Sequence, residues 1–246
     1  MTNRLDGKCM LITGAARRIG AAIATLLHNS GATIAVHYRN SADDAQALVN
    51  NLNALRGDSA RAFQADLLLT AQLPSLIDEV LAWSGRLDGL VNNASSFYPT
   101  PIGEISEQDW DALIGSNLKA PLFLAQAAHP ELAQRRGSIV NIVDIHAQRP
   151  LRDHSVYGSA KAGLAMLTRS LAKDLAPDVR VNGVSPGAIL WPENGMSDAV
   201  KDTIIEQIPL ARPGNPEDIA GCVLYLVRDA SYVTGQIIAV IIITRD

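Results

Sequence analysis

Residues 9–20 read Cys9-Met10-Leu11-Ile12-Thr13-Gly14-Ala15-Ala16-Arg17-Arg18-Ile19-Gly20, and this stretch decides the fold. An apolar segment with strand character, Cys9–Thr13, runs into a turn with glycine at both ends, and helical periodicity follows from Arg18. The free N–H groups and the dipole at a helix N-terminus favour anions, and small residues let a phosphate approach the backbone. The stretch predicts a strand–turn–helix unit that binds a phosphate-bearing cofactor, although an ordinary unit of this kind has the same pattern.

The same order of strand and then helix repeats along the rest of the chain. Strands are predicted over Cys9–Thr13, Thr33–His37, Ala60–Ala65, Gly89–Asn92, Ser138–Val143, Arg180–Ser185 and Gln236–Ile243. Helices are predicted near residues 18–29, 42–55, 73–84, 107–134, 156–175 and 216–228. This alternation indicates an α/β fold, a Rossmann-type doubly wound parallel sheet of about seven strands with helices on both faces.

Two segments depart from the regular pattern. Ser106 and Asp109 resemble a capping box at the start of the helix 107–134, and Pro121 predicts a break or bend inside it. The connection 186–207 contains Pro, Gly, Asn and Trp without periodicity. We interpret this connection as a substrate loop because it follows the carboxyl end of a strand, where ligands bind in such sheets; a plain tether is the alternative.

The composition limits the kinds of protein that this chain can be. With 246 residues, 48% of them hydrophobic, residues 1–246 are expected to form a single domain around one core. A net charge of −4 without a basic stripe argues against a nucleic-acid partner. The N-terminus lacks a signal-peptide core, and no apolar run reaches the roughly 20 residues of a spanning helix, so we expect a cytoplasmic protein with no membrane partner. Cys9 and Cys222 are interpreted as buried thiols, and no metal site is expected.

The end of the second predicted strand indicates which cofactor the turn binds. It reads His37-Tyr38-Arg39-Asn40-Ser41, and the first acid after it is Asp43. NAD sites place an acid here for the ribose 2′-hydroxyl, whereas NADP sites offer positive charge and donors to the 2′-phosphate. Arg17, Arg39 and Ser41 can gather around that phosphate without a competing acid, so the predicted cofactor is NADP(H). Either arginine alone would be interpreted as a solvated surface residue.

Tyr157 and Lys161 can carry the acid–base chemistry of a hydride-transfer enzyme. They are four residues apart on a predicted helix, so they share one face and can meet one ligand. A phenol with a reference pKa near ~10 is a poor acid–base group at neutral pH, and a nearby ammonium lowers that pKa. The pair therefore suits proton exchange with a carbonyl or an imine. Taken alone, the same spacing is also that of an ordinary surface pair.

Several motifs, in the right order, resemble the short-chain dehydrogenase/reductase family over almost the whole chain. They are Thr13-Gly14…Gly20, Asp66-Leu67, Asn92-Asn93-Ala94, Asn117, Tyr157…Lys161 and Pro186-Gly187. The family normally has serine thirteen residues before the tyrosine, where this chain has Asp144. Asp144, Arg18 in place of the middle glycine of the turn, and the run Asn93–Pro99 together resemble the pteridine reductase branch.

The resemblance implies a role for each catalytic candidate. Lys161 would hydrogen-bond the nicotinamide ribose and favour phenolate at Tyr157, which would act as the proton donor in reduction. Asp144 would hydrogen-bond Tyr157 or the ligand and help to move a proton to a pterin ring nitrogen. Asn117 would hold a water molecule that links Lys161 to solvent. Without Tyr157 downstream, Asp144 would instead be interpreted as a strand-end residue that turns the chain.

The resemblance also implies a substrate pocket. Phe97 would sandwich a pterin against the nicotinamide, with Ser95 at the ring edge, although simple loop packing is an equal interpretation of Phe97 taken alone. Trp191 either lines the pocket or anchors the connection around it. His146 and His154 match nothing in the family pattern and are interpreted as loop residues.

The implied cofactor site draws on the glycine turn, the end of the second strand and the later loops. Its residues are Gly14, Arg17, Arg18, Ile19, Gly20, His37, Arg39, Asn40, Ser41, Asp66, Leu67, Asn92, Ala94, Ser95, Tyr157, Lys161, Pro186 and Gly187.

The expected assembly follows the family, but the end of the chain departs from it. The resemblance implies a homotetramer with two-fold axes. After Val240 the family usually continues Asp-Gly-Gly, whereas this chain has Ile241-Ile242-Ile243, which cannot make a turn at positive φ without strain. Either the last strand runs longer here or this tail is not the natural one. A dimer in place of the homotetramer is therefore the alternative assembly. Small residues that would let the Tyr157 helix approach a neighbour are Ala160, Ala162, Gly163 and Ala165.

We therefore expect an NADPH-dependent reductase of dihydropterins of the dihydrofolate, dihydrobiopterin or dihydromonapterin type. A reductase of ketones or 3-oxoacyl thioesters on the same scaffold is the alternative, favoured if Asp144 merely mimics the usual serine. A non-catalytic NADP(H) sensor is a third interpretation. The intact set of Asn117, Tyr157 and Lys161 counts against it, because a sensor has no need of a proton relay.

Overall fold

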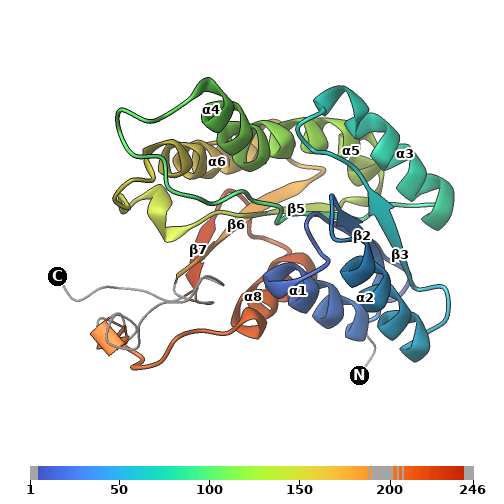
Figure 1. Cartoon of the computed structure of the whole chain (residues 1–246). Helices are drawn as coiled ribbons and strands as arrows, with labels where there is room; N and C mark the ends of the chain where they lie inside the picture. Colours follow the sequence, from blue (N-terminus) through green and yellow to red (C-terminus); the bar gives the residue numbers. More distant parts are fainter. Residues whose placement is uncertain (1–4, 188, 190–201, 204, 207, 241–246) are drawn as a thin grey trace.

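The computed structural model describes residues 5–187, 189, 202–203, 205–206 and 208–240, which include one seven-stranded sheet (Figure 1). The strand order is β3-β2-β1-β4-β5-β6-β7. All neighbouring strands are parallel, so the predicted doubly wound sheet is confirmed. The bounds are β1 Cys9–Ile12, β2 Thr33–Tyr38, β3 Ala60–Gln64, β4 Gly89–Asn92, β5 Ser138–Ile142, β6 Arg180–Pro186 and β7 Ile237–Val240.

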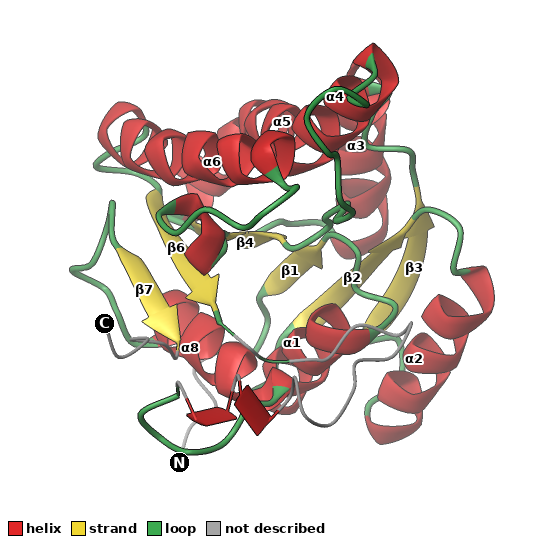
Figure 2. Ribbon diagram, turned by 60° about the vertical axis from the view of Figure 1, so that its left-hand side comes forward, coloured by secondary structure: helices red, strands yellow, loops and turns green. Residues whose placement is uncertain are grey.

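Helices cover both faces of the sheet, as Figure 1 and Figure 2 show, with α1, α2 and α8 on one face and the others opposite. Consecutive residues of a strand point to opposite faces. Ile12 accordingly shares a core cluster with Ile23 of α1, whereas Leu11 shares the opposite cluster with Leu124 of α5. The bounds are α1 Arg18–Asn29, α2 Ala42–Leu55, α3 Leu73–Ser84, α4 Glu107–Ile114, α5 Ala120–Arg135, α6 Ser155–Asp174 and α8 Pro216–Arg228.

The predicted helix 107–134 is divided in the structure. α4 passes into a π-helical turn over Gly115–Lys119 before α5 begins. Pro121 lies in the first turn of α5, where its missing N–H costs no helical hydrogen bond, so the interruption comes just before the proline. The predicted capping box is confirmed, because the N–H of Asp109 donates to Ser106 Oγ over 3.1 Å and the reciprocal bond is also present.

Most other predicted boundaries agree with the structure to within a residue, which is the usual scatter at element ends. The last predicted strand is described only as far as Val240, and Ile241-Ile242-Ile243 lie outside the described residues. Cys9 is buried as predicted, whereas Cys222 is only partly buried.

The small residues of α6 pack mainly inside the chain. Ala160 is fully buried and Ala165 is 6% exposed, and a Cβ added at Gly163 would lie 2.8 Å from Leu118 Cδ2. Of the four small residues, only Ala162 is exposed. Ala160 and Ala165 therefore serve packing within the chain, and the homotetramer stays a prediction from the family resemblance.

The carboxyl ends of the parallel strands form one edge of the sheet, and the site lies there. From β1 the chain builds the sheet outward through β2 and β3, and from β4 it builds in the opposite direction. Ligands bind in doubly wound sheets at this reversal, between β1 and β4. In the part of the chain that the structure describes, no helix has both the length and the apolar character needed to cross a bilayer.

Candidate active site

The turn after β1 has the shape that a phosphate site needs. Gly14 adopts a φ of +60°, and a Cβ on it would touch Ala94 at 3.0 Å. A Cβ on Gly20 would lie 2.3 Å from the carbonyl oxygen of Gly14, so only glycine fits there. Asn93 Nδ2 donates to the carbonyl oxygens of Thr13 and Gly14 over 2.9 and 3.0 Å, which fixes the turn against the β4 loop.

Arg18 stands where the family usually has the middle glycine of the turn, yet it keeps a conformation that favours glycine. Its φ is +55°, in the left-handed region that few residues with side chains adopt. Arginine at this position thus has a backbone conformation that glycine adopts readily, and it adds a cationic side chain at the start of α1.

His37 supports the turn through hydrogen bonds rather than charge. Its Nδ1 accepts from the N–H of Gly14 over 3.1 Å, and its Nε2 lies 3.1 Å from the carbonyl oxygen of Ala65. Burial lowers the pKa of His37 to about 4, so the imidazole is neutral at pH 7 with its proton on Nε2. His37, predicted as a cofactor-binding residue, thus adds no positive charge to the site.

A cavity of about 450 Å³ lies over the glycine turn and the ends of β2 and β3, within the range of roughly 300–1,000 Å³ typical of ligand sites. The turn, the cavity and the cationic side chains on its wall together fit a dinucleotide cofactor. Predicted cofactor residues that line it are Gly14, Arg17, Arg18, Ile19, Gly20, His37, Arg39, Asn40, Ser41, Asp66, Leu67, Ala94 and Ser95.

Five predicted cofactor residues do not line this cavity: Asn92, Tyr157, Lys161, Pro186 and Gly187. Asn92 is buried and donates through Nδ2 to Asn141 Oδ1 over 2.8 Å, so its amide holds β4 to β5. Pro186 ends β6, and the Gly187 N–H donates to the Val240 carbonyl over 3.3 Å.

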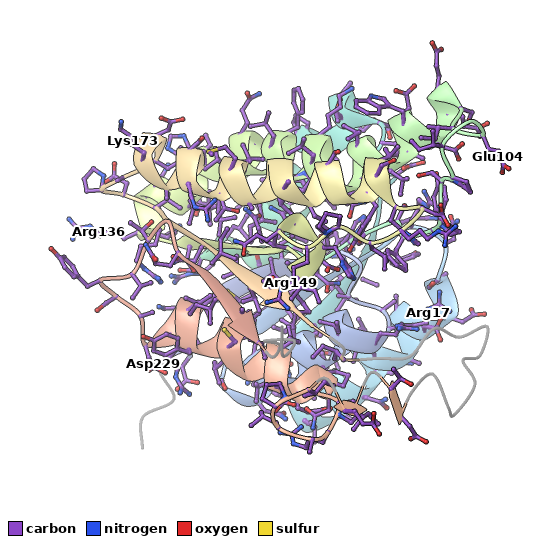
Figure 3. The ribbon with its side chains drawn as sticks, turned by 90° about the vertical axis from the view of Figure 1, so that its left-hand side faces the viewer. Arg17, Glu104, Arg136, Arg149, Lys173 and Asp229 are labelled. Atoms are coloured by element: carbon purple, nitrogen blue, oxygen red, sulfur yellow. The ribbon has the colours of Figure 1, made fainter. Side chains whose placement is uncertain are left out.

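Arg17 has an acidic neighbour that the sequence did not suggest. Its Nε lies 3.6 Å from Oδ2 of Asp44 in α2, and both side chains are about half exposed. Figure 3 shows Arg17 at the edge of the molecule. The expectation that no acid competes for Arg17 is therefore wrong. An exposed ion pair of this kind contributes only about 0–1 kcal/mol to stability. A bound phosphate group could therefore take the place of Asp44 as the partner of Arg17.

Tyr157 and Asp144 form the closest polar contact of the candidate catalytic group. The Tyr157 hydroxyl donates to Asp144 Oδ2 over 2.6 Å. Asp144 Oδ1 accepts from the backbone N–H of His146 over 2.9 Å and so starts the short 3₁₀ turn Ile145–Ala147. The two interpretations of Asp144, a turn residue and a partner of Tyr157, are both correct.

Burial dominates the electrostatics of this group. Burial, followed by the charge and hydrogen bond of Asp144, raises the pKa of Tyr157 well above its usual value. Lys161 is 2% exposed, its Nζ donates to the Ile142 carbonyl over 2.9 Å, and burial lowers its pKa to about 8. The expected lowering of the Tyr157 pKa by Lys161 is not seen in the protein's own residues, because Nζ lies 5.7 Å from the phenol ring centroid and Asp144 is closer.

Asn117 ties the substrate-side loop to the helix. It lies in the π-helical turn, where its Oδ1 accepts from Ser95 Oγ over 2.7 Å and its Nδ2 donates to the Ser96 carbonyl over 2.9 Å. Such turns occur often at functional sites. Asn117 thereby fixes the loop that carries Ser95 and Phe97, and its predicted water-holding role stays a prediction.

Phe97 lies beside Tyr157, with ring centroids 4.8 Å apart in an edge arrangement. On another side it stacks with His154 at 4.7 Å. The sequence analysis placed His154 in a loop, as the structure does, but did not predict its contact with Phe97; the available signal was its position three residues before Tyr157. Trp191 and most of the connection 186–207 lie outside the described residues.

Comparisons with known proteins agree on family and reaction class. A family model described as Enoyl-(Acyl carrier protein) reductase matches residues 14–240. Pteridine reductase 1 of Leishmania tarentolae is 38% identical over 281 residues, covering 98% of this chain and 97% of that protein. The 3-oxoacyl-[acyl-carrier-protein] reductase FabG of Staphylococcus epidermidis is 39% identical over 237 residues, covering 95% and 97%. An uncharacterized oxidoreductase of Methylorubrum extorquens is 36% identical over 242 residues, covering 96% and 97%.

By name these relatives are two reductases and an oxidoreductase, so the interpretation as a non-catalytic sensor is set aside. Two different substrates occur among relatives of nearly equal identity, and identity alone therefore does not choose between them. With its parallel sheet and motifs, the chain belongs to the short-chain dehydrogenase/reductase family and is a nicotinamide-dependent oxidoreductase of a small-molecule substrate.

Proposed function

We propose that this protein is an NADPH-dependent reductase of dihydropterins of the dihydrofolate, dihydrobiopterin or dihydromonapterin type. The observation that carries the proposal is the 2.6 Å hydrogen bond from the Tyr157 hydroxyl to Asp144, at a position where the family usually has serine. A carboxyl group can both accept and, when protonated, donate a proton, which suits protonation of a ring nitrogen. The similarity to a pteridine reductase supports the same conclusion.

The residues around Tyr157 suit a flat substrate. Phe97 offers a half-exposed aromatic surface within 4.8 Å of the Tyr157 ring centroid. Ser95 places a hydroxyl on the same loop, held by Asn117. A heterocyclic bicycle could cover the Phe97 ring while its edge meets polar groups, as aromatic pairs prefer offset or edge arrangements.

The polar residues of the cofactor site and of the catalytic group have separate roles in this proposal. Arg17, Arg39 and Ser41 would hold the 2′-phosphate of NADPH, which supplies the hydride when bound. The raised pKa keeps Tyr157 protonated at neutral pH, and donation of that proton requires that the resulting phenolate be stabilised. Lys161, whose pKa burial lowers to about 8, still carries its positive charge on most molecules at pH 7 and can stabilise the phenolate left after proton donation.

Replacement of Arg39 tests the cofactor. Arg39→Ala should weaken NADPH binding about tenfold or more, because a charge-assisted contact to the 2′-phosphate is worth about 1.5–3 kcal/mol. NADH affinity should stay nearly unchanged, since NADH has no such phosphate. Arg61→Ala removes a cation of the adjacent strand that does not line the cavity, and it should leave both affinities alone. Equal losses of NADPH and NADH affinity in Arg39→Ala would contradict the choice of NADP(H).

A panel of dihydropterins and keto compounds, assayed by loss of NADPH absorbance, tests the substrate. The unaltered protein should reduce at least one dihydropterin, and Asp144→Ser should lower that kcat by about 10²-fold or more, the usual size of a general acid–base contribution. Carbonyl reduction should survive in Asp144→Ser, because serine is the residue usual in the family. Good reduction of keto compounds with no dihydropterin turnover, or unchanged pterin turnover in Asp144→Ser, would sink the proposal.

The second candidate is a reductase of ketones or 3-oxoacyl thioesters, which the similarity to a 3-oxoacyl-[acyl-carrier-protein] reductase favours. On this alternative Asp144 only takes the place of serine as a hydrogen-bond partner of Tyr157. Asp144→Ser would then leave keto reduction unchanged or raise it, so the same variant separates the two candidates.

A further inference from the structure

The Phe97 ring is held by two other rings and still leaves room for a ligand. The Phe97 and His154 rings are nearly parallel, with centroids 4.7 Å apart and an angle of 21°. The Tyr157 ring meets Phe97 at 78°. Even with these neighbours, 52% of the Phe97 surface is exposed. The Phe97 side chain thus contacts two rings at the start of α6, while about half of its surface stays exposed.

Hydrogen bonds to the backbone hold the His154 imidazole and the turn that carries it in place. Nδ1 lies 2.7 Å from the Arg152 carbonyl oxygen, and because a carbonyl only accepts, Nδ1 carries the proton. The His154 carbonyl accepts from the Gly158 N–H over 2.8 Å, in the first turn of α6. The Thr100 N–H donates to the Asp153 carbonyl over 2.5 Å, which joins the loop between β4 and α4 to the same turn.

We infer that His154 is a positioning residue that fixes the Phe97 ring for stacking against a flat heterocyclic substrate. This inference rests on the proposed pterin reductase function. His154 immediately precedes α6, and Tyr157 lies in the first turn of that helix. The imidazole therefore fixes the position of the Phe97 ring relative to the Tyr157 phenol. Without the imidazole, Phe97 on its exposed loop would gain rotamers that a bound substrate must freeze again.

Substitution of His154 should affect substrate affinity without affecting chemistry. His154→Ala should raise KM for dihydrobiopterin roughly three- to tenfold, as expected for the loss of one aromatic pair. The kcat at saturating substrate and the NADPH Kd should stay unchanged. His154→Phe keeps a flat ring and should restore KM. The His154 side chain makes no capping hydrogen bond to α6, so alanine does not uncap the helix.

A merely structural role would give a different pattern. His154→Ala would then lower thermal stability and NADPH affinity together with substrate affinity, and phenylalanine would not rescue them. His146→Ala is the matched control, because His146 lies in the same connection and its Nδ1 likewise bonds a backbone carbonyl, that of Arg149, over 2.9 Å. A KM increase in His146→Ala equal to that in His154→Ala would overturn the inference.

A measurement without turnover separates this inference from the proposed function. The chain has three phenylalanines, so labelling with 4-fluorophenylalanine gives three fluorine signals, and Phe97→Leu identifies that of Phe97. This signal should shift in His154→Ala, where the ring current of the stacked imidazole is lost, and stay in place in His146→Ala. If the unaltered protein reduces no dihydropterin, the proposed function fails, while the fluorine signal still tests whether His154 holds Phe97. An unmoved signal in His154→Ala, or a KM increase that His154→Phe does not rescue, overturns the inference.

Discussion

Tyr157→Phe is expected to lower kcat by about 10²–10⁴-fold while NADPH binds as before. The substitution removes only the hydroxyl that donates to Asp144 over 2.6 Å, and a phenyl ring can keep the edge contact with Phe97. Substrate reduction then loses its proton donor, and the cavity over the glycine turn is untouched. Steady-state turnover together with an NADPH titration by fluorescence measures both properties on the same preparation.

Tyr225→Phe is the matched control for that experiment. Tyr225 lies in α8 and is 45% exposed, and it does not line the cofactor cavity, so the loss of its hydroxyl should change neither kcat nor NADPH affinity. A Tyr157→Phe protein with nearly unaltered kcat would show that the proton relay is assigned to the wrong residue. A parallel loss of NADPH binding would instead show that the phenol supports the cofactor site.

Gly20→Ala should destabilise the protein by about 2–3 kcal/mol, the upper part of the usual cost of overpacking, and abolish cofactor binding. The added Cβ would lie 2.3 Å from the Gly14 carbonyl oxygen, 2.6 Å from Asn93 Nδ2 and 2.9 Å from Ala15 Cα. Two of these atoms belong to the backbone of the turn itself, which cannot yield without losing its shape. Denaturant unfolding and an NADPH titration test the two consequences.

The same substitution at Gly221 should have the opposite sign. Gly221 lies inside α8, and nothing is within 4 Å of a Cβ built on it. Gly221→Ala should therefore stabilise the protein by roughly 0.5–1 kcal/mol, because alanine loses less backbone entropy in a helix. If both alanine variants change the free energy of unfolding alike, the close packing of the glycine turn does not determine its stability.

Local sequence patterns predicted the elements of this fold well. Alternating apolar runs and helical periodicity depend on neighbours in the chain, so they located the strands and helices and indicated the parallel sheet. The shared face of Tyr157 and Lys161 likewise follows from their spacing on one helix. The π-helical turn at Gly115–Lys119 was not predicted, because bonds of this type have no simple pattern of residues.

Contacts between loops that are distant in the chain could not be predicted from the sequence. The bond from Gly14 to His37, the stacking of Phe97 on His154 and the ion pair between Arg17 and Asp44 each join separate segments. No periodicity relates such residues, and they meet only after the sheet has brought the strand ends together. The contact of Asp144 with Tyr157 was anticipated through the family resemblance, as one of two possibilities.

The buried amides of β4 and β5 have a consequence for how the sheet assembles. Both faces of these strands are buried and most of their side chains are apolar, so a slip of two residues would keep every side chain on its own face and cost little hydrophobic burial. Asn92 lies opposite Asn141, which also donates to Thr168 Oγ1 over 2.9 Å. A slip of β4 against β5 would break the bond from Asn92 Nδ2 to Asn141 Oδ1 and leave a buried donor without its partner, at a cost of about 1–3 kcal/mol. The bond between Asn92 and Asn141 therefore favours the native register of β4 and β5 over a slipped one.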